Sequence, residues 1–151
     1  MPGKGDIFTI SLNDNRFVIG QVIQFDERGL SCYSCGLFDI LSEDEIEIND
    51  INLGFSQCFS VILVTPDCFS SRNKWKIQGN KNPVIPKKFY PYEDLRKKRK
   101  PGSRIYDKQT IEEFVNAYYA LLPWDNYYKP DFLDELLLTP SKKPKNLIYS
   151  K

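Results

Sequence analysis

The sequence contains no histidine, the side chain that most often acts as a general base near neutral pH. Serine and cysteine nucleophiles of the common triad type rely on a neighbouring histidine, so its absence excludes both. An enzyme based on lysine, arginine or carboxylates is the remaining catalytic hypothesis. Carboxylates such as Asp39 and Glu45 would need a cleft that raises their pKa. We therefore expect a protein that is not an enzyme.

The sequence also lacks long hydrophobic runs. No apolar stretch approaches the roughly 20 residues that a helix needs to cross a bilayer. Residues 1–6 contain no apolar core of the kind found in a secretory signal peptide. We expect a cytoplasmic protein that makes no contact with a membrane.

Cysteine is scarce, and the four cysteines do not form a regular metal motif. Cys32 and Cys35 have the two-residue gap of a zinc knuckle or a redox pair, whereas Cys58 and Cys68 are too far apart for its second half. A redox pair of this kind normally begins a helix, but Cys32 and Cys35 lie in a β-rich run. We expect four buried free thiols, no metal and no other cofactor.

The remaining composition is that of a globular protein with many aromatic residues. The chain has 151 residues, 41% of them hydrophobic and 14% aromatic, and a formal net charge of +1. This length fits one domain with a real core, and the aromatic residues favour β structure. A net charge so near zero argues against a dedicated nucleic-acid-binding protein.

Residues 5–23 have the pattern of a β-hairpin. Two runs rich in β-branched and aromatic residues flank residues 13–15, which are Asn-Asp-Asn and suit a three-residue turn. In the first run Phe8, Ile10 and Leu12 alternate with smaller or polar residues, so that one face can be buried.

Three further strands are predicted after the hairpin. Residues 30–38 and 57–65 are strongly apolar, and the second of these runs is expected to cross the core. Residues 73–79 alternate, which predicts that Trp75 and Ile77 point inward.

The last third of the chain has helical periodicity instead. Asp107 is predicted to cap a helix whose apolar face repeats at helical spacing as far as Leu122, and Pro123 ends this helix. A second, short helix is expected over residues 130–137, and Pro140 begins a lysine-rich tail.

These elements predict an α+β fold. A twisted antiparallel β-sheet, or an SH3-like partly open barrel, would span about residues 5–80 and be followed by two C-terminal helices within 107–138. Residues 81–106 would form a basic irregular connection and residues 139–151 a tail. Because neither part alone has a generous core, we expect residues 1–151 to form a single domain.

The middle of the chain is acidic. Between residues 37 and 55 there is no lysine or arginine, and there are six carboxylates: Asp39, Glu43, Asp44, Glu45, Glu47 and Asp50. Residues 45–48 alternate between glutamate and isoleucine and predict a strand with both glutamates on one face. The charge is interpreted either as protection of a sheet edge from pairing with other chains or as an anionic surface for a basic partner.

The following segment is basic. From Arg72 to Arg104 there are twelve lysines or arginines and only Glu93 and Asp94 against them. The densest run, residues 96–100, is typical of a hydrated loop, and phosphate contact with a nucleic acid is the alternative interpretation.

Several separated segments share one pattern. They are residues 5–8 with Ile10 and Leu12, residues 16–17, 20–22, 74–79 and 86–89, Phe59 with Val61, and residues 122–131 and 136–137. This pattern resembles the Imm26 family, the immunity proteins of bacterial polymorphic toxin systems. Ser11 stands where the family often has proline, and residues 72–74 lack its usual glycine, which concerns strand detail more than fold. The resemblance implies structural roles for eight residues: Gly5, Asp6, Phe8, Leu12, Gly20, Trp75, Gly79 and Trp124.

The resemblance implies a protein of contact-dependent competition between bacteria. Such a protein binds a cognate toxin domain stoichiometrically, and many toxins of these systems are nucleases with cationic surfaces. The six acidic residues of the segment 39–50 are then the candidate toxin-binding residues. The alternative is a nucleic-acid-binding SH3-like small barrel that uses residues 96–100, since a hairpin opening with Gly-Asp-Ile also occurs in such barrels.

Overall fold

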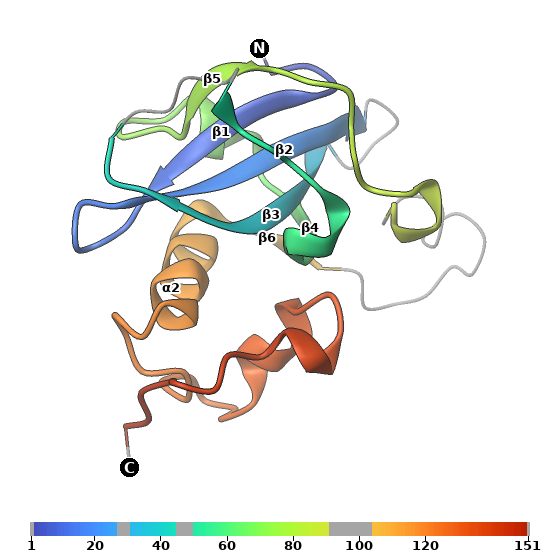
Figure 1. Cartoon of the computed structure of the whole chain (residues 1–151). Helices are drawn as coiled ribbons and strands as arrows, with labels where there is room; N and C mark the ends of the chain where they lie inside the picture. The colour runs from blue at the N-terminus through green and yellow to red at the C-terminus, as the bar shows by residue number, and fades with distance from the viewer. Residues whose placement is uncertain (1, 27–30, 45–49, 91–103, 151) are drawn as a thin grey trace.

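The centre of the molecule is an open, mixed β-sheet packed against one α-helix (Figure 1). The structure is a computed structural model that describes residues 2–26, 31–44, 50–90 and 104–150. Six strands of these residues pair in the order β5-β1-β2-β3-β4-β6, antiparallel except for the parallel pair β4 and β6. The strands are β1 Asp6–Ser11, β2 Phe17–Asp26, β3 Cys32–Ser42, β4 Cys58–Val64, β5 Lys76–Asn80 and β6 Ile105–Tyr106.

Strands β1 and β2 form the predicted hairpin. Their register runs from the pair Ile7–Gln21 to the pair Ser11–Phe17. Beyond it, the Leu12 N–H donates to the Arg16 carbonyl at 2.8 Å. Asn15 takes the left-handed conformation with φ of 69°, as the last residue of a three-residue hairpin loop often does. The prediction of a three-residue turn is therefore confirmed.

Phe8 and Gly20 lie opposite each other in this hairpin. A Cβ atom on Gly20 would overlap the Phe8 ring, so the ring occupies the space that any other residue at position 20 would need. The same ring stacks on Trp75 with centroids 5.3 Å apart and meets Phe69 edge-on at 5.1 Å. This aromatic group anchors β5 and the preceding turn to the hairpin.

Both faces of the sheet are covered. The main core lies between the sheet, α2 and the C-terminal segment, and it joins Phe8 to Phe114, Trp124 and Leu136. On the other face, smaller clusters bring residues 51–61 and 84–90 against the strands. The predicted SH3-like barrel is not observed, because the sheet stays open and these segments cover its second face. The coarser prediction, an α+β fold, is confirmed.

Helix α2, Lys108–Tyr118, begins where the sequence predicts. Asp107 accepts a hydrogen bond from the Thr110 N–H at 2.8 Å and caps the helix. The helix ends before Leu122 because Ala120 takes a left-handed conformation with φ of 60° and the Leu121 N–H returns to the Asn116 carbonyl at 2.8 Å. None of the helices among the described residues combines the length and apolar character needed to cross a membrane.

The second, short helix predicted at residues 130–137 is present only as a 3₁₀ helix and not as an α-helix. Within the described part of this region the chain forms only the short 3₁₀ helices η5, Phe132–Leu136, and η6, Pro140–Lys142. Strand β4 forms two hydrogen bonds with the backbone of residues 136–138. The Ser60 hydroxyl donates to the Leu136 carbonyl at 2.5 Å, and the Leu138 N–H donates to the Phe59 carbonyl at 2.8 Å. These tertiary hydrogen bonds replace the ones that a continuing α-helix would make.

Strand β5 begins later than predicted, and its isoleucine is not buried. Trp75 precedes the strand and is buried, whereas Ile77 remains 42% exposed. Because β5 is an edge strand of the described sheet, Ile77 has a neighbouring strand on one side only. The prediction that Ile77 points into the core is wrong.

Candidate functional site

The acidic residues of the middle segment are exposed but do not gather at one place. Four of the six lie in the described residues, and all are exposed: Asp39, Glu43, Asp44 and Asp50. Asp39 contacts helix α2, whereas Asp50 precedes Ile51, which packs on the other face of the sheet. Glu45 and Glu47, with the strand predicted around them, lie outside the described residues.

Asp39 forms one wall of a tyrosine-lined hollow of about 350 Å³. The Tyr119 hydroxyl donates to Asp39 Oδ1 at 2.7 Å. Burial, and then this hydrogen bond, raise the pKa of Tyr119, while burial and the Asp39 charge raise the pKa of Tyr118 to about 12. The two phenols therefore stay neutral beside a carboxylate, an arrangement that suits the centre of a protein interface.

A second, more acidic hollow of about 540 Å³ lies along the first turns of α2. Its carboxylates come from the 3₁₀ helix η3, Pro66–Phe69, and from the helix and its cap: Asp67, Asp107, Glu112 and Glu113. Lys108 is the only cation among its described lining residues. Asp107, Glu112 and Glu113 are close in the sequence but do not have the three- or four-residue spacing of one helix face, and no local signal places Asp67 beside them.

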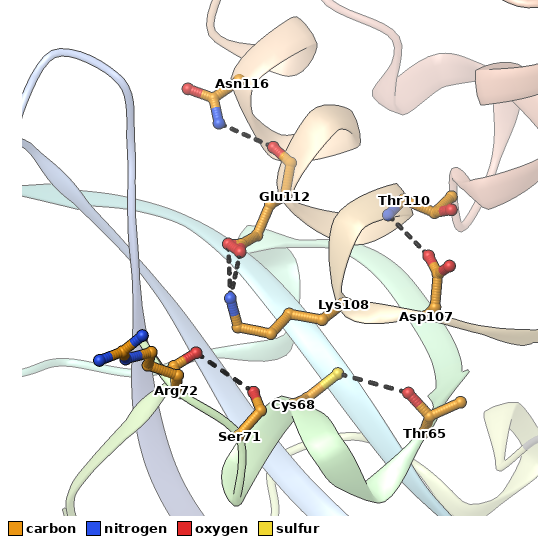
Figure 2. Close-up of polar contacts among 9 residues, drawn as sticks. All are labelled: Thr65, Cys68, Ser71, Arg72, Asp107, Lys108, Thr110, Glu112 and Asn116. Carbon is orange, nitrogen blue, oxygen red and sulfur yellow. Dashed lines mark hydrogen bonds and ion pairs between the residues drawn. The ribbon is translucent and has the colours of Figure 1, made fainter.

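The carboxylates of this acidic hollow are held by neighbouring donors (Figure 2). Thr110 bonds the Asp107 carboxylate, which lowers the pKa of Asp107. Lys108 Nζ lies 2.5 Å from Glu112 Oε1 (Figure 2). The Tyr127 hydroxyl donates to Glu113 Oε2 at 2.5 Å. These contacts hold Asp107, Glu112 and Glu113 in place, so that they can receive a cationic side chain.

Asn116 ties the hairpin tip to this hollow. It is buried, and its Oδ1 accepts a hydrogen bond from the Asn13 N–H at 2.8 Å. Its Nδ2 donates to the Glu112 carbonyl at 2.7 Å (Figure 2). The tip of the hairpin and the helix therefore form one rigid wall of the hollow.

The eight residues of the family pattern lie mostly inside the fold. Phe8, Leu12, Gly20, Trp75 and Trp124 are buried in or against the main core. Gly5 has φ of 87° and sits directly against the Lys81 carbonyl, so only glycine fits there. Asp6 accepts a hydrogen bond from the Asn80 side chain at 3.0 Å, next to Gly79 in β5. Their geometry is that of fold-determining residues.

The four cysteines are buried and form no disulfide bond. Burial raises the pKa of Cys58 to about 11 and that of Cys68 to about 12, so neither thiol is an activated nucleophile. Cys35 is buried completely, and its pKa is raised for the same reason. The described residues contain no cluster of three or more cysteine or carboxylate side chains arranged to hold a metal ion.

The thiols give the native protein a characteristic reactivity. We expect Ellman's reagent to label the native protein very slowly at about pH 8 and to label all four cysteines after denaturation. The thiol pKa of the unfolded chain is near 9, below the native values, so the stabilisation by neutral buried thiols is complete below pH 9 and is lost as pH rises from 9 through about 11. Urea unfolding at increasing pH measures this loss. Rapid labelling of the native protein would contradict the expected burial.

Comparison of the chain with known proteins identifies no related protein. No family model matches the chain, and neither a curated protein nor a solved structure is significantly similar to it.

Proposed function

We propose that this protein is an immunity protein, which neutralises a cognate bacterial toxin by stoichiometric binding. The observation that carries the proposal is the hollow along α2, in which four carboxylates face a single lysine. The sequence resemblance to the Imm26 family supports the same function. A surface of this kind attracts a basic partner and requires no catalytic group on the inhibitor.

The site combines the two features expected of a tight interface. Tyr118 and Tyr119 supply aromatic surface beside Asp39, and the acidic hollow supplies charge that is already oriented before binding. Nanomolar neutralisation corresponds to about −12 kcal/mol, and a standard interface buries roughly 1,600 Å² in total. An interface of that size is large enough to include both hollows of α2.

The expected partner is a toxin domain with a cationic surface, of which a nuclease is one class. Carboxylates at the site would repel a nucleic acid, because its phosphates carry the same charge. The alternative function, a nucleic-acid-binding small barrel, relies on residues 96–100, which lie outside the described residues. Strong retention on heparin at physiological salt would support that alternative instead.

Charge reversal at the site tests the proposal. We expect the double variant Asp67→Lys/Glu113→Lys, and separately Asp39→Lys/Glu43→Lys/Asp44→Lys, to weaken toxin binding by on the order of 10- to 1,000-fold, chiefly through slower association. The neighbouring genes are searched for a toxin domain. Surface plasmon resonance against that domain measures the rates, and co-expression with it measures rescue of the cell.

The matched control is Asp131→Lys, an exposed aspartate next to η5 that lines neither hollow. It should bind as the unmodified protein does. Unchanged affinity in both multiple variants, with circular dichroism showing a native fold, would overturn the proposed binding surface. Failure of the unmodified protein to bind the toxin or to rescue the cell would overturn the function itself.

A further inference from the structure

A third hollow, of about 390 Å³, lies where β1 extends beyond the start of β5. Residues of the hairpin, of the turn before β5 and of α2 all line it. Its charged lining consists of three lysines, Lys74, Lys76 and Lys108, against one carboxylate, Glu112. The hollow is therefore electropositive, in contrast to the acidic hollow on the other side of the Lys108–Glu112 pair.

The indole of Trp75 lines this basic hollow and carries an unsatisfied donor. The residue is only 3% exposed, and its Nε1 is the one buried side-chain nitrogen or oxygen among the described residues without a hydrogen-bond partner. Buried indole N–H groups usually find an acceptor. The other tryptophan follows this rule, since Trp124 Nε1 donates to Asp134 Oδ1 at 2.7 Å.

The Trp75 donor is also held rigidly. Its ring is parallel to that of Phe8, with an interplanar angle of 6°, and perpendicular to that of Phe69, with an angle of 90°. Its backbone N–H donates to the Cys68 carbonyl at 2.8 Å. The position of the N–H is thus fixed by the packing of the core.

The carboxylate of Glu112 does not prevent an anion from binding in this hollow, because its charge is balanced by Lys108. Both oxygens of Glu112 contact Lys108 Nζ, at 2.5 and 3.2 Å, and the lysine side chain is only 17% exposed. The Thr9 hydroxyl oxygen accepts a hydrogen bond from Gln78 Nε2 at 3.2 Å, which leaves its own hydrogen available to donate. The lining thus offers donors and positive charge.

From this geometry we propose that the basic hollow binds a small oxyanion, a carboxylate or phosphate group. Trp75 Nε1 donates the hydrogen bond, and Lys74 supplies positive charge, since the charge of Lys108 is already balanced by Glu112. The site shares Lys108 and Glu112 with the acidic hollow, but it needs no toxin partner to bind its anion. It is a binding site for a ligand of its own.

Two-dimensional ¹H–¹⁵N NMR tests the proposal on the protein alone, because the chain has only two indole N–H groups. Sodium phosphate and sodium acetate are titrated separately at constant ionic strength, with chloride as the balancing ion. We expect the Trp75 indole peak to shift downfield and to saturate at millimolar concentrations of one of these anions, which tells phosphate from carboxylate. The Trp124 peak should stay in place, since its N–H is already bonded.

The variant Lys74→Gln should bind the anion at least about tenfold more weakly, because it removes one charge of the site. Lys87→Gln removes the same charge from an exposed position outside the hollow and should bind normally. The variant Trp75→Phe assigns the peak. The proposal is overturned if neither anion gives a saturable shift, if both indole peaks move together, or if Lys87→Gln weakens binding as much as Lys74→Gln does.

Discussion

The Gly20→Val variant should lose about 3 kcal/mol or more of the free energy of unfolding. The new side chain would occupy the volume of the Phe8 ring, which lies directly across the hairpin. That ring cannot move aside without separating from Trp75 and Phe69 in the main core. Urea denaturation followed by circular dichroism and tryptophan fluorescence measures the change.

A matched glycine separates this packing effect from the general effect of adding a side chain. Gly3 has no atom within 4 Å of the position of an added Cβ, so Gly3→Val should change the stability by about 0.5 kcal/mol or less. The double variant Gly20→Ala/Phe8→Leu should recover part of the stability lost by Gly20→Ala, because the smaller side chain at position 8 returns volume. Native stability of Gly20→Val would show that the hairpin packs differently.

The Trp124→Ala variant should lose about 3–5 kcal/mol, the usual cost of removing a large buried aromatic side chain. Trp124 is 1% exposed and packs against Phe114 of α2 with centroids 5.9 Å apart. Its loss also removes the hydrogen bond to Asp134, which holds the C-terminal segment. Thermal and urea unfolding of the variant measure the loss.

The same experiment tests the expectation of a single domain. Because the main core joins the sheet to residues 111–137, Trp124→Ala should lower the stability of the whole chain in one transition. Tyr128→Ala is the control, since that side chain is 85% exposed and its removal should cost about 0.5 kcal/mol or less. Separate transitions for the sheet and the C-terminal segment would contradict the single-domain expectation.

The elements predicted correctly depend on neighbours in the sequence. The Asn-Asp-Asn turn fixes the hairpin through its own backbone geometry, and Asp107 fixes the start of α2 through a hydrogen bond three residues away. A short helix at residues 130–137 was predicted, but its 3₁₀ form could not be, because Ser60 and Phe59 of a distant strand form hydrogen bonds with its C-terminal end. The openness of the sheet could not be predicted either, because it depends on segments distant in the sequence that cover the second face of the sheet.

The candidate site illustrates the same limit. The amino-acid composition of residues 39–50 identifies an acidic segment. It does not show that the described residues of this segment lie on two faces of the sheet. The acidic hollow joins Asp67 to carboxylates of α2 that are forty or more residues away in the sequence. No periodicity spans that separation, since the turn η3 and the helix meet only through the packing of the main core.

The Lys108–Glu112 ion pair belongs to the acidic hollow and to the basic hollow at once. A cation entering the first would compete for Glu112, and an anion entering the second would compete for Lys108. A cation that binds Glu112 would free Lys108 for an anion, and an anion that binds Lys108 would free Glu112 for a cation. The two proposed sites would thus be thermodynamically linked: the factor by which a bound anion changes the affinity for a basic partner would equal the factor by which that partner changes the affinity for the anion.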